Sequence, residues 1–329
     1  MGTKSILNIE EVKSLIEQNK NLVIAGDENL LKKLPKGNWI GGTIPYFIGD
    51  EGGLCTKDYL HVTEFPAACH MKSIKQYKES ELANIMKDYP ENGFSYIIIP
   101  ATSTSHTKFA NEVTTYDGLF NSPLVGWISG VHLDDLGSIT PKVFNGHTLN
   151  FSEGDAIVFH VELENSYYPK TEIINLFAQG SGDKIEFLSS GFEVTDALVN
   201  GEKVNFSKYL TSKNIGAELP LVANYSGANV NVSFQTIDTD NALVQLYAPV
   251  FEGMEYRIAT PIQDYKNEFE KVLQENSITP IFSCNCILNY LYAELEGKKP
   301  GGITGPITFG EIAYMLLNQT MVYVSLEKK

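Results

Sequence analysis

The sequence contains a single arginine, Arg257, among 25 basic residues. The chain therefore cannot bind several phosphates or carboxylates in the bidentate way, because that needs the planar guanidinium group of arginine, which lysine lacks. Acidic residues number 40, and the formal net charge is −15. Nucleic-acid binding requires a basic face, so the composition argues against a nucleic-acid partner.

Long hydrophobic runs are also missing. No apolar segment of the sequence approaches the roughly 20 residues that a membrane-spanning helix needs. The N-terminal segment MGTKSILNIEEV lacks the apolar core of a secretory signal. We therefore expect a cytoplasmic protein without a membrane partner.

Cysteine is sparse as well, and the four cysteines are Cys55, Cys69, Cys284 and Cys286. They are too few for a disulfide scaffold, and their spacing does not fit the paired ligands of a zinc site. The sequence therefore predicts no metal and no cofactor.

Asp134 and Asp135 follow His132 closely in the sequence. A carboxylate that orients an imidazole is typical of a metal or haem ligand. The alternative, which we favour, is a solvated acidic turn. We accordingly expect no haem binding.

The chain of 329 residues is longer than one hydrophobic core usually supports, which favours two domains. The character of the sequence changes near residue 190. We therefore expect one domain over residues 1–190 and another over residues 191–329.

Two segments share one pattern, which predicts related halves. The same order of predicted elements occurs in residues 23–49 and in residues 281–310. It is a strand, a polar helix cap, a helix that ends at lysine and glycine residues, and a glycine-rich strand. Each returns along an alternating strand, at residues 59–65 or 320–326. This repeat predicts an α+β fold of two related halves, with mixed or antiparallel sheets covered by helices and a groove between the halves.

Local signals predict several elements. Asn8 and Asp27 are expected to cap helices, and Asn200-Gly201 is a hairpin signal. Residues 94–100 are the most hydrophobic strand and should be central in a sheet. A further helix is predicted over residues 284–296, with Ser283 as its cap.

Cys284 is the best candidate for a nucleophile. In the first turn of its predicted helix, the thiol would face free N–H groups that favour the thiolate. A catalytic cysteine also needs a base, and no histidine follows His160 in the sequence. The favoured alternative is that Cys284 and Cys286 are small buried residues at a strand–helix junction.

Glu311 is the other residue that calls for an explanation, because it lies in an apolar strand pair. A buried carboxylate there must be paired, hydrogen-bonded or open to a cavity. An edge-strand glutamate that faces water is an equally acceptable interpretation.

The chain resembles the FIST family of sensory domains, in its form with an N-terminal and a C-terminal part. Phe282-Ser-Cys284, Thr308-Phe-Gly-Glu-Ile312 and Leu317-Asn-Gln-Thr320 are similar to the closing pattern of that family. Pro123-Leu-Val-Gly126 resembles a segment of its N-terminal part. The resemblance makes residues 1–190 and 191–329 the two FIST-like parts.

The resemblance implies a small-molecule-binding sensor whose ligands include amino acids, and which passes its signal to a separate signalling protein. A cysteine-dependent hydrolase or transferase that uses Cys284 is the alternative, although an enzyme is the less expected outcome. A purely structural scaffold is a third interpretation.

We expect the ligand to lie where the two glycine-rich strands approach each other. Free N–H groups of the helix after Cys284 would favour a carboxylate, and Glu311 would bind an amine. Trp127 would supply an apolar wall and Asn285 hydrogen bonds, with Gly310 allowing close approach. The alternative is that these five residues only pack the domain junction.

Overall fold

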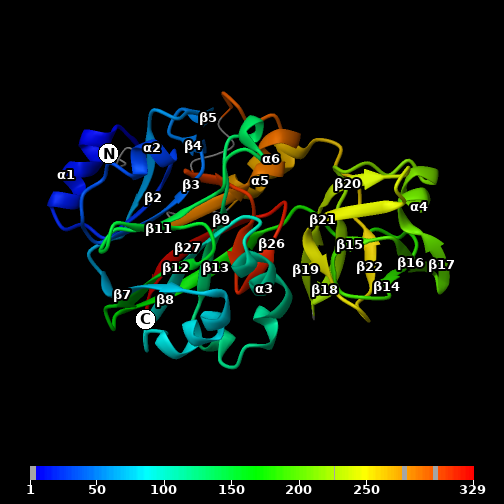
Figure 1. Ribbon diagram of the computed structural model, residues 1–329, viewed down its shortest axis with the longest axis horizontal. Helices are drawn as coiled ribbons and strands as arrows, with labels where there is room; N and C mark the ends of the chain where they lie inside the picture. Colours follow the sequence, from blue (N-terminus) through cyan, green and yellow to red (C-terminus); the bar gives the residue numbers. More distant parts are fainter. Residues whose placement is uncertain (1–4, 226, 276–279, 299–302) are drawn as a thin grey trace.

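The computed structural model describes residues 5–225, 227–275, 280–298 and 303–329. Two lobes of unequal size stand side by side (Figure 1). The chain between β14 (Ile185–Phe187) and β22 (Tyr256–Ile258) forms the smaller lobe, and the segments before and after it form the larger one. The mixed and antiparallel sheets with few helices confirm the predicted α+β class. No helix within the described segments is long and apolar enough to cross a membrane.

The first sheet of the larger lobe carries α1 (Ile9–Glu17) and α2 (Glu28–Leu31) against it. Asn8 caps α1 in a capping box, and Asp27 caps α2, so both predicted helix starts are confirmed. Across this sheet the strands are β1 (Ile6–Leu7), β6 (Leu60–Glu64), β2 (Leu22–Gly26), β3 (Trp39–Thr43), β10 (Val143–Asn145) and β11 (Asn150–Ser152).

The second sheet contains the strand that was predicted to be central. Its order is β26 (Met315–Leu317), β25 (Glu311–Ala313), β9 (Leu124–Ser129), β8 (Gly93–Pro100), β12 (Ala156–Leu163) and β7 (Cys69–Tyr77). Every residue of β8 is buried between β9 and β12, as its composition predicted. α3 (Thr104–Glu112) and the 3₁₀ segment η1 (Glu79–Asp88) contact strands of this sheet. Three further 3₁₀ segments are η2 (Val113–Thr115), η3 (Leu119–Asn121) and η4 (Leu133–Asp135).

The third sheet joins the two glycine-rich stretches. Its order is β13 (Tyr167–Ile174), β27 (Met321–Lys328), β23 (Phe282–Cys286), β24 (Gly305–Thr308), β4 (Tyr46–Gly49) and β5 (Gly52–Cys55). In the sequence, α5 (Tyr265–Glu275) precedes β23, and α6 (Ile287–Tyr292) lies between β23 and β24. Gly305 lies opposite Ile48, and a Cβ on Gly305 would lie 2.3 Å from the carbonyl oxygen of Ser283. Glycine is therefore required there by close backbone approach.

The internal repeat is visible in the strand pairing. β2 and β3 are parallel and α2 lies between them in sequence, and β6 pairs antiparallel on the other side of β2. β23 and β24 are parallel around α6, and β27 pairs antiparallel on the other side of β23. The two units thus have the order and strand directions that the sequence repeat predicted, and both lie in the larger lobe.

The predicted helix over residues 284–296 was wrong at its start. Cys284 lies in β23 opposite Val322 of β27, and the helix begins only at Ile287. Ser283, the expected cap, instead donates its hydroxyl to the carbonyl of Thr304 over 2.6 Å. Pairing with β27 on one side and β24 on the other outweighs the local helix signal. Cys284 therefore has no place in a first helical turn.

Strands from both sides of residue 190 share sheets in the larger lobe. β27 pairs with β13 along its length, and β25 pairs with β9. The smaller lobe has sheets of its own, and Asn200-Gly201 closes its predicted hairpin with φ values of 51° and 88°. Its remaining elements are β15 (Gly191–Val194), β16 (Asp196–Val199), β17 (Glu202–Asn205), α4 (Phe206–Ser212), β18 (Leu221–Tyr225), β19 (Ala228–Val232), β20 (Phe234–Asp238) and β21 (Leu243–Val250).

Candidate ligand-binding site

Trp127 and Glu311 lie opposite each other on the neighbouring strands β9 and β25. The indole of Trp127 is fully buried, and its Nε1–H donates to Tyr96 Oη over 2.9 Å. Gly310 packs tightly against the same strands, because a Cβ there would lie 2.9 Å from Leu316 and 3.1 Å from Ile128. These three predicted site residues are thus brought together inside the larger lobe, in tight packing.

The Glu311 carboxylate is fully buried and is bonded by the protein itself. Thr320 donates to Oε2 from its hydroxyl over 2.8 Å and from its amide over 3.3 Å, and Thr308 donates to Oε1 over 3.3 Å. Burial raises the pKa of Glu311 to about 8, although these donors act to lower it. Because β25 lies between β9 and β26, an edge glutamate facing water is excluded.

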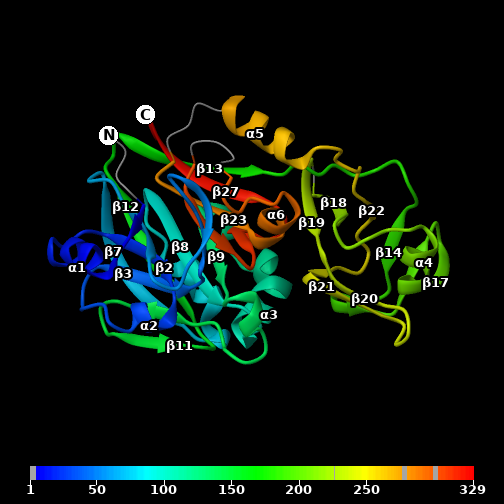
Figure 2. The ribbon, with the colours of Figure 1, turned by 90° about the horizontal axis from the view of Figure 1, so that it is seen from above.

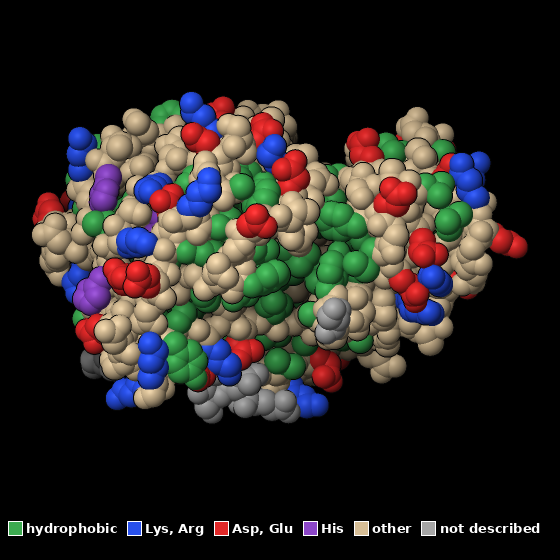
Figure 3. Space-filling view, turned by 90° about the horizontal axis from the view of Figure 1, so that it is seen from below, with side chains coloured by type: hydrophobic (Ala, Val, Ile, Leu, Met, Phe, Trp, Pro, Cys, Tyr) green, Lys and Arg blue, Asp and Glu red, His purple; other side chains and the backbone are tan. Residues whose placement is uncertain are grey.

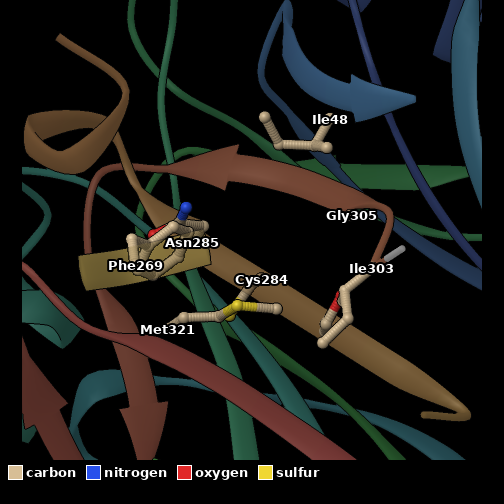
Figure 4. Close-up of a pocket in the computed structure, with 8 residues that line it drawn as sticks. Ile48, Phe269, Cys284, Asn285, Ile303, Gly305 and Met321 are labelled. Atoms are coloured by element: carbon tan, nitrogen blue, oxygen red, sulfur yellow. The ribbon is translucent and has the colours of Figure 1, made fainter. Parts of the chain in front are cut away.

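Cys284 and Asn285 line a cavity of only about 10 Å³ (Figure 4). Such a volume holds about one water molecule. Figure 4 shows Cys284 beside Met321 and Asn285 beside Phe269. The Cys284 thiol lies 3.5 Å from the carbonyl of Gly126, and burial raises its pKa well above the usual range. This cavity has no room for a metabolite.

A much larger cavity, of about 510 Å³, lies between the two lobes. The larger lobe contributes the start of α3, the segment after β9, the first turn of α6, Phe309 and Asn318. The smaller lobe contributes residues of β15, β20 and β21. α3 and α6 face the smaller lobe (Figure 2), and the surface is notched between the lobes, with hydrophobic side chains on both sides of the notch (Figure 3). Junctions of this kind and size are usual places for small-molecule sites.

The lining of this inter-lobe cavity is mainly apolar. Phe192 and Leu246 line it from the smaller lobe and Phe309 from the larger one. Leu136 and Ile139 also line it, although their exposed fractions are 56% and 42%. Exposed aliphatic side chains beside an apolar cavity leave hydrophobic surface that a ligand can cover.

The lining of the inter-lobe cavity contains almost no charged side chains. Among its residues that the structure describes, only Glu193 carries a formal charge, and its carboxylate accepts a hydrogen bond of 3.2 Å from Gln245. Glu193 is exposed, so it lies toward solvent and not in the interior. The cavity therefore offers no buried counter-ion to a charged ligand.

His106 supplies a hydrogen-bond donor without an acceptor. Its Nδ1 accepts from the amide of Thr102 over 3.2 Å, which places the hydrogen of the neutral ring on Nε2. Nε2 is buried and has no partner among the described residues. Burial lowers the pKa of His106 to about 4, so the ring is neutral at physiological pH.

The strained backbone of Thr102 holds the hydrogen bond from its amide to His106 in place. Thr102 has a φ of 62°, and a β-branched residue rarely adopts the left-handed region. Such strain is often found where the backbone must present a group in a fixed direction. Here the presented group is the Thr102 amide, which fixes the tautomer of His106.

Asn318 supplies the complementary group, an acceptor without a donor. It is 1% exposed, its Nδ2 donates to the carbonyl of Leu317, and its Oδ1 has no partner in the described chain. Asn231 of β19 donates to the Asn318 carbonyl over 3.1 Å. Ser233 donates to Gln319 Oε1 over 2.6 Å. The turn that carries Asn318 is therefore bonded to the smaller lobe.

Cys286, and not Cys284, lines the inter-lobe cavity. Its thiol pKa is raised well above the usual range, first by burial and then by the charge of Glu311. The amides of Leu288 and Asn289 act in the opposite direction, but burial outweighs them. The thiol is thus held protonated, as in a structural cysteine.

Two other histidines, His132 and His160, make contacts within the protein. His132 accepts from the amide of Asp134 over 3.2 Å and stacks on Tyr46, which fits the acidic turn. His160 lies 2.7 Å from Ser95 and 2.8 Å from Tyr77. Neither Ser95 nor His160 has any exposed surface, so this pair cannot reach a substrate. No group of three or more metal-binding side chains is found in the described part of the chain.

Sequence reasoning missed His106 and Asn318 as site residues. Both were visible, His106 near the start of α3 and Asn318 in the Asn-Gln-Thr stretch. Their relation was not visible, because it depends on the smaller lobe, which closes the cavity. The polar run Asn-Gln-Thr between two apolar segments was the one signal that could have pointed to it.

Comparison with known proteins gives one family. The sequence model of a family of unknown function, DUF6976, matches residues 7–327. No curated protein matches the chain.

Proposed function

The chain belongs to the DUF6976 family, and since the function of that family is unknown, we propose from the site alone that the protein is a small-molecule-binding module. The ligand occupies the inter-lobe cavity. The observation that carries this proposal is a cavity of about 510 Å³ between the lobes with a mainly apolar lining.

A sensory role fits the position of the cavity. Both lobes line it, so a ligand that contacts both stabilises one relative placement of the lobes over others. That change could be recognised by a separate signalling protein in the cytoplasm. The FIST resemblance is consistent with such a role, and it remains part of the proposal.

A cysteine-dependent enzyme is the weaker candidate. Cys284 borders only the 10 Å³ cavity, and Cys286, which borders the large one, has a thiol pKa well above the usual range. The thiolate is the reactive form, so neither sulfur is prepared for attack. The charge of Glu311 raises the pKa of both thiols further, and hydrogen bonds from Thr320 and Thr308 hold its carboxyl group in the interior.

The proposal is tested by a thermal-shift screen of metabolites on the wild-type chain and on two tryptophan variants. Thr107 lies on α3 and lines the cavity, so Thr107→Trp fills it. Glu112→Trp places the same side chain at the exposed end of α3, away from the cavity, and is the control. A binding ligand raises the unfolding midpoint by mass action. We expect the shift to vanish in Thr107→Trp and to persist in Glu112→Trp; equal shifts in all three chains would contradict the proposed site.

A further inference from the structure

Most polar side chains that line the inter-lobe cavity are bonded within the protein or face water. Thr102 and Thr107 donate their hydroxyls to backbone carbonyls over 2.6 Å and 3.3 Å, and Gln245 donates to a carboxylate of its own lobe over 3.2 Å. Thr140 and Gln235 are exposed. A ligand rich in hydroxyl or amide groups would find few free partners there, and burying such groups unpaired is costly. The lining therefore disfavours sugars and nucleosides.

Tyr247 of β21 differs from these residues. It lines the cavity and is half-buried, and its hydroxyl makes no hydrogen bond with the described residues. That oxygen is not one of the buried unpartnered atoms, so it keeps accessible surface, whereas the unpartnered atoms of His106 and Asn318 are buried. Burial raises the pKa of Tyr247, so its hydroxyl stays protonated and can donate a hydrogen bond to a ligand.

Charge and apolar surface restrict the ligand further. Within the described lining, the single charged group is the exposed Glu193, so an ionised ligand would lose hydration without gaining a buried counter-ion. Phe192 and Leu246 line the cavity from one lobe and Phe309 from the other, and Leu136 leaves apolar surface uncovered beside it. Burying an apolar compound against these side chains is favourable.

We infer that the ligand is an uncharged and mainly apolar compound with a carbonyl or hydroxyl oxygen at one end. That oxygen accepts a hydrogen bond from the Tyr247 hydroxyl, which lies near Cys286, and the apolar body lies against the side chains of Phe192, Phe309 and Leu246. This inference rests on the proposed function, and it departs from the zwitterionic amino acid that the sequence favoured.

The competing explanation is that the Tyr247 hydroxyl binds only water. Water is a regular partner of polar groups in cavities. In that case a ligand gains nothing from its oxygen, and removal of the hydroxyl affects compounds with and without the oxygen equally. The two explanations therefore differ in one measurable quantity, the change in the affinity ratio of two such compounds when Tyr247 is replaced by phenylalanine.

The test uses four compounds with one apolar body, the 6-acetyl, 6-ethyl, 6-carboxylate and 6-aminomethyl derivatives of 2-dimethylaminonaphthalene. Affinities are measured by fluorescence titration of the wild-type chain, with Thr107→Trp as the blocked control. The carboxylate and the ammonium compound find no buried counter-ion in the described lining, so we expect them to bind at least about tenfold more weakly than the acetyl compound.

Two variants test the contact with the oxygen. Tyr247→Phe removes the donor, so the acetyl-to-ethyl affinity ratio should fall about fivefold, and the emission of the bound acetyl compound should shift to shorter wavelength. Tyr59→Phe changes an exposed tyrosine outside this lining and should leave the ratio and the emission as in the wild type. Circular dichroism checks the folding of each variant, and the wild-type comparison of neutral and charged compounds tests the inference even if Tyr247→Phe does not fold.

The outcomes separate this inference from the proposed function. Equal or tighter binding of the carboxylate or the ammonium compound overturns the inference, and so does an acetyl-to-ethyl ratio that Tyr247→Phe leaves unchanged. If the binding is lost in Thr107→Trp, the proposed function stands, whereas binding that persists in that variant contradicts both. Failure of all four compounds also overturns the inference, and the proposed function then depends on the metabolite screen alone.

Discussion

Thr320 donates two hydrogen bonds to Glu311, from its hydroxyl over 2.8 Å and from its amide over 3.3 Å, and both end on the same carboxylate oxygen. Thr320 immediately precedes β27, and Glu311 begins β25. The pair therefore links the second and third sheets of the larger lobe. It does so with a fully buried carboxyl group, which makes stability depend on pH.

Glu311→Gln should remove a loss of stability that the wild type shows as pH rises from about 4.5 to about 8. The pKa of Glu311 is about 8 in the folded chain and about 4.5 in the unfolded chain. Between these values the folded chain holds a proton that the unfolded chain has released, so stability falls as pH rises. The slope is about 1.4 kcal/mol per pH unit for one group. Urea unfolding from pH 5 to pH 8 should show this slope in the wild type and lose it in the glutamine variant; parallel curves would contradict the assignment.

His61→Phe should reduce the loss of stability in acid. Burial lowers the pKa of His61 from 6.5 to about 3, and its ring stacks on Phe47. As pH falls below 6.5 the unfolded chain binds a proton that the folded chain refuses, so stability falls. Phenylalanine keeps the stacking and cannot be protonated. Unfolding between pH 7 and pH 4 should be less pH-dependent in this variant, whereas the exposed His70→Phe should match the wild type.

Leu136→Ser and Ile139→Ser should weaken ligand binding without destabilising the fold. Both side chains are partly exposed and line the cavity. Their apolar surface is therefore buried chiefly when a ligand is bound. We expect a loss of about 1 kcal/mol each, or roughly fivefold in affinity. Calorimetry with the best ligand measures this loss. Leu188→Ser, on an exposed residue outside this lining, is the control; a similar loss there would argue against a specific contact.

Alkylation should separate the cysteines of the native chain. Cys55 is partly exposed, whereas Cys284 and Cys286 are each 1% exposed. Burial raises the pKa of all three thiols, and it raises those of Cys284 and Cys286 well above the usual range. Iodoacetamide at pH 7.5 should modify Cys55 first and leave the other two nearly unmodified until the chain unfolds. Peptide mass spectrometry gives the rates. Rapid modification of Cys286 in the folded chain would favour the enzyme alternative.

Much of the fold was predictable because its signals are local. The caps at Asn8 and Asp27, the buried strand β8 and the turn at Asn200-Gly201 each depend on a few neighbouring residues. The order shared by the two halves was predictable for the same reason. Their helices and glycine-rich strands have matching signals, and the strand pairing repeats accordingly.

The failures concern long-range contacts. Residues 284–286 have an acceptable helix signal, but pairing with β27 and β24 makes them a strand. Glu311 was expected to reach a ligand, but Thr308 and Thr320 use its oxygens. The inter-lobe cavity combines residues more than 200 positions apart, such as His106 and Asn318. A single sequence gives no indication that two residues so far apart line the same cavity.

Hydrogen exchange in the presence and absence of the best ligand tests the binding site most directly. The account predicts slower exchange in the three segments of the larger lobe that line the cavity, which are residues 101–107, 131–141 and 286–288, and in β15 and β21 across the junction. Exchange in the distant β6 should not change. Protection confined to residues 283–285 and 310–311, or no protection near the cavity at a saturating ligand concentration, would contradict the claim that the ligand binds between the lobes.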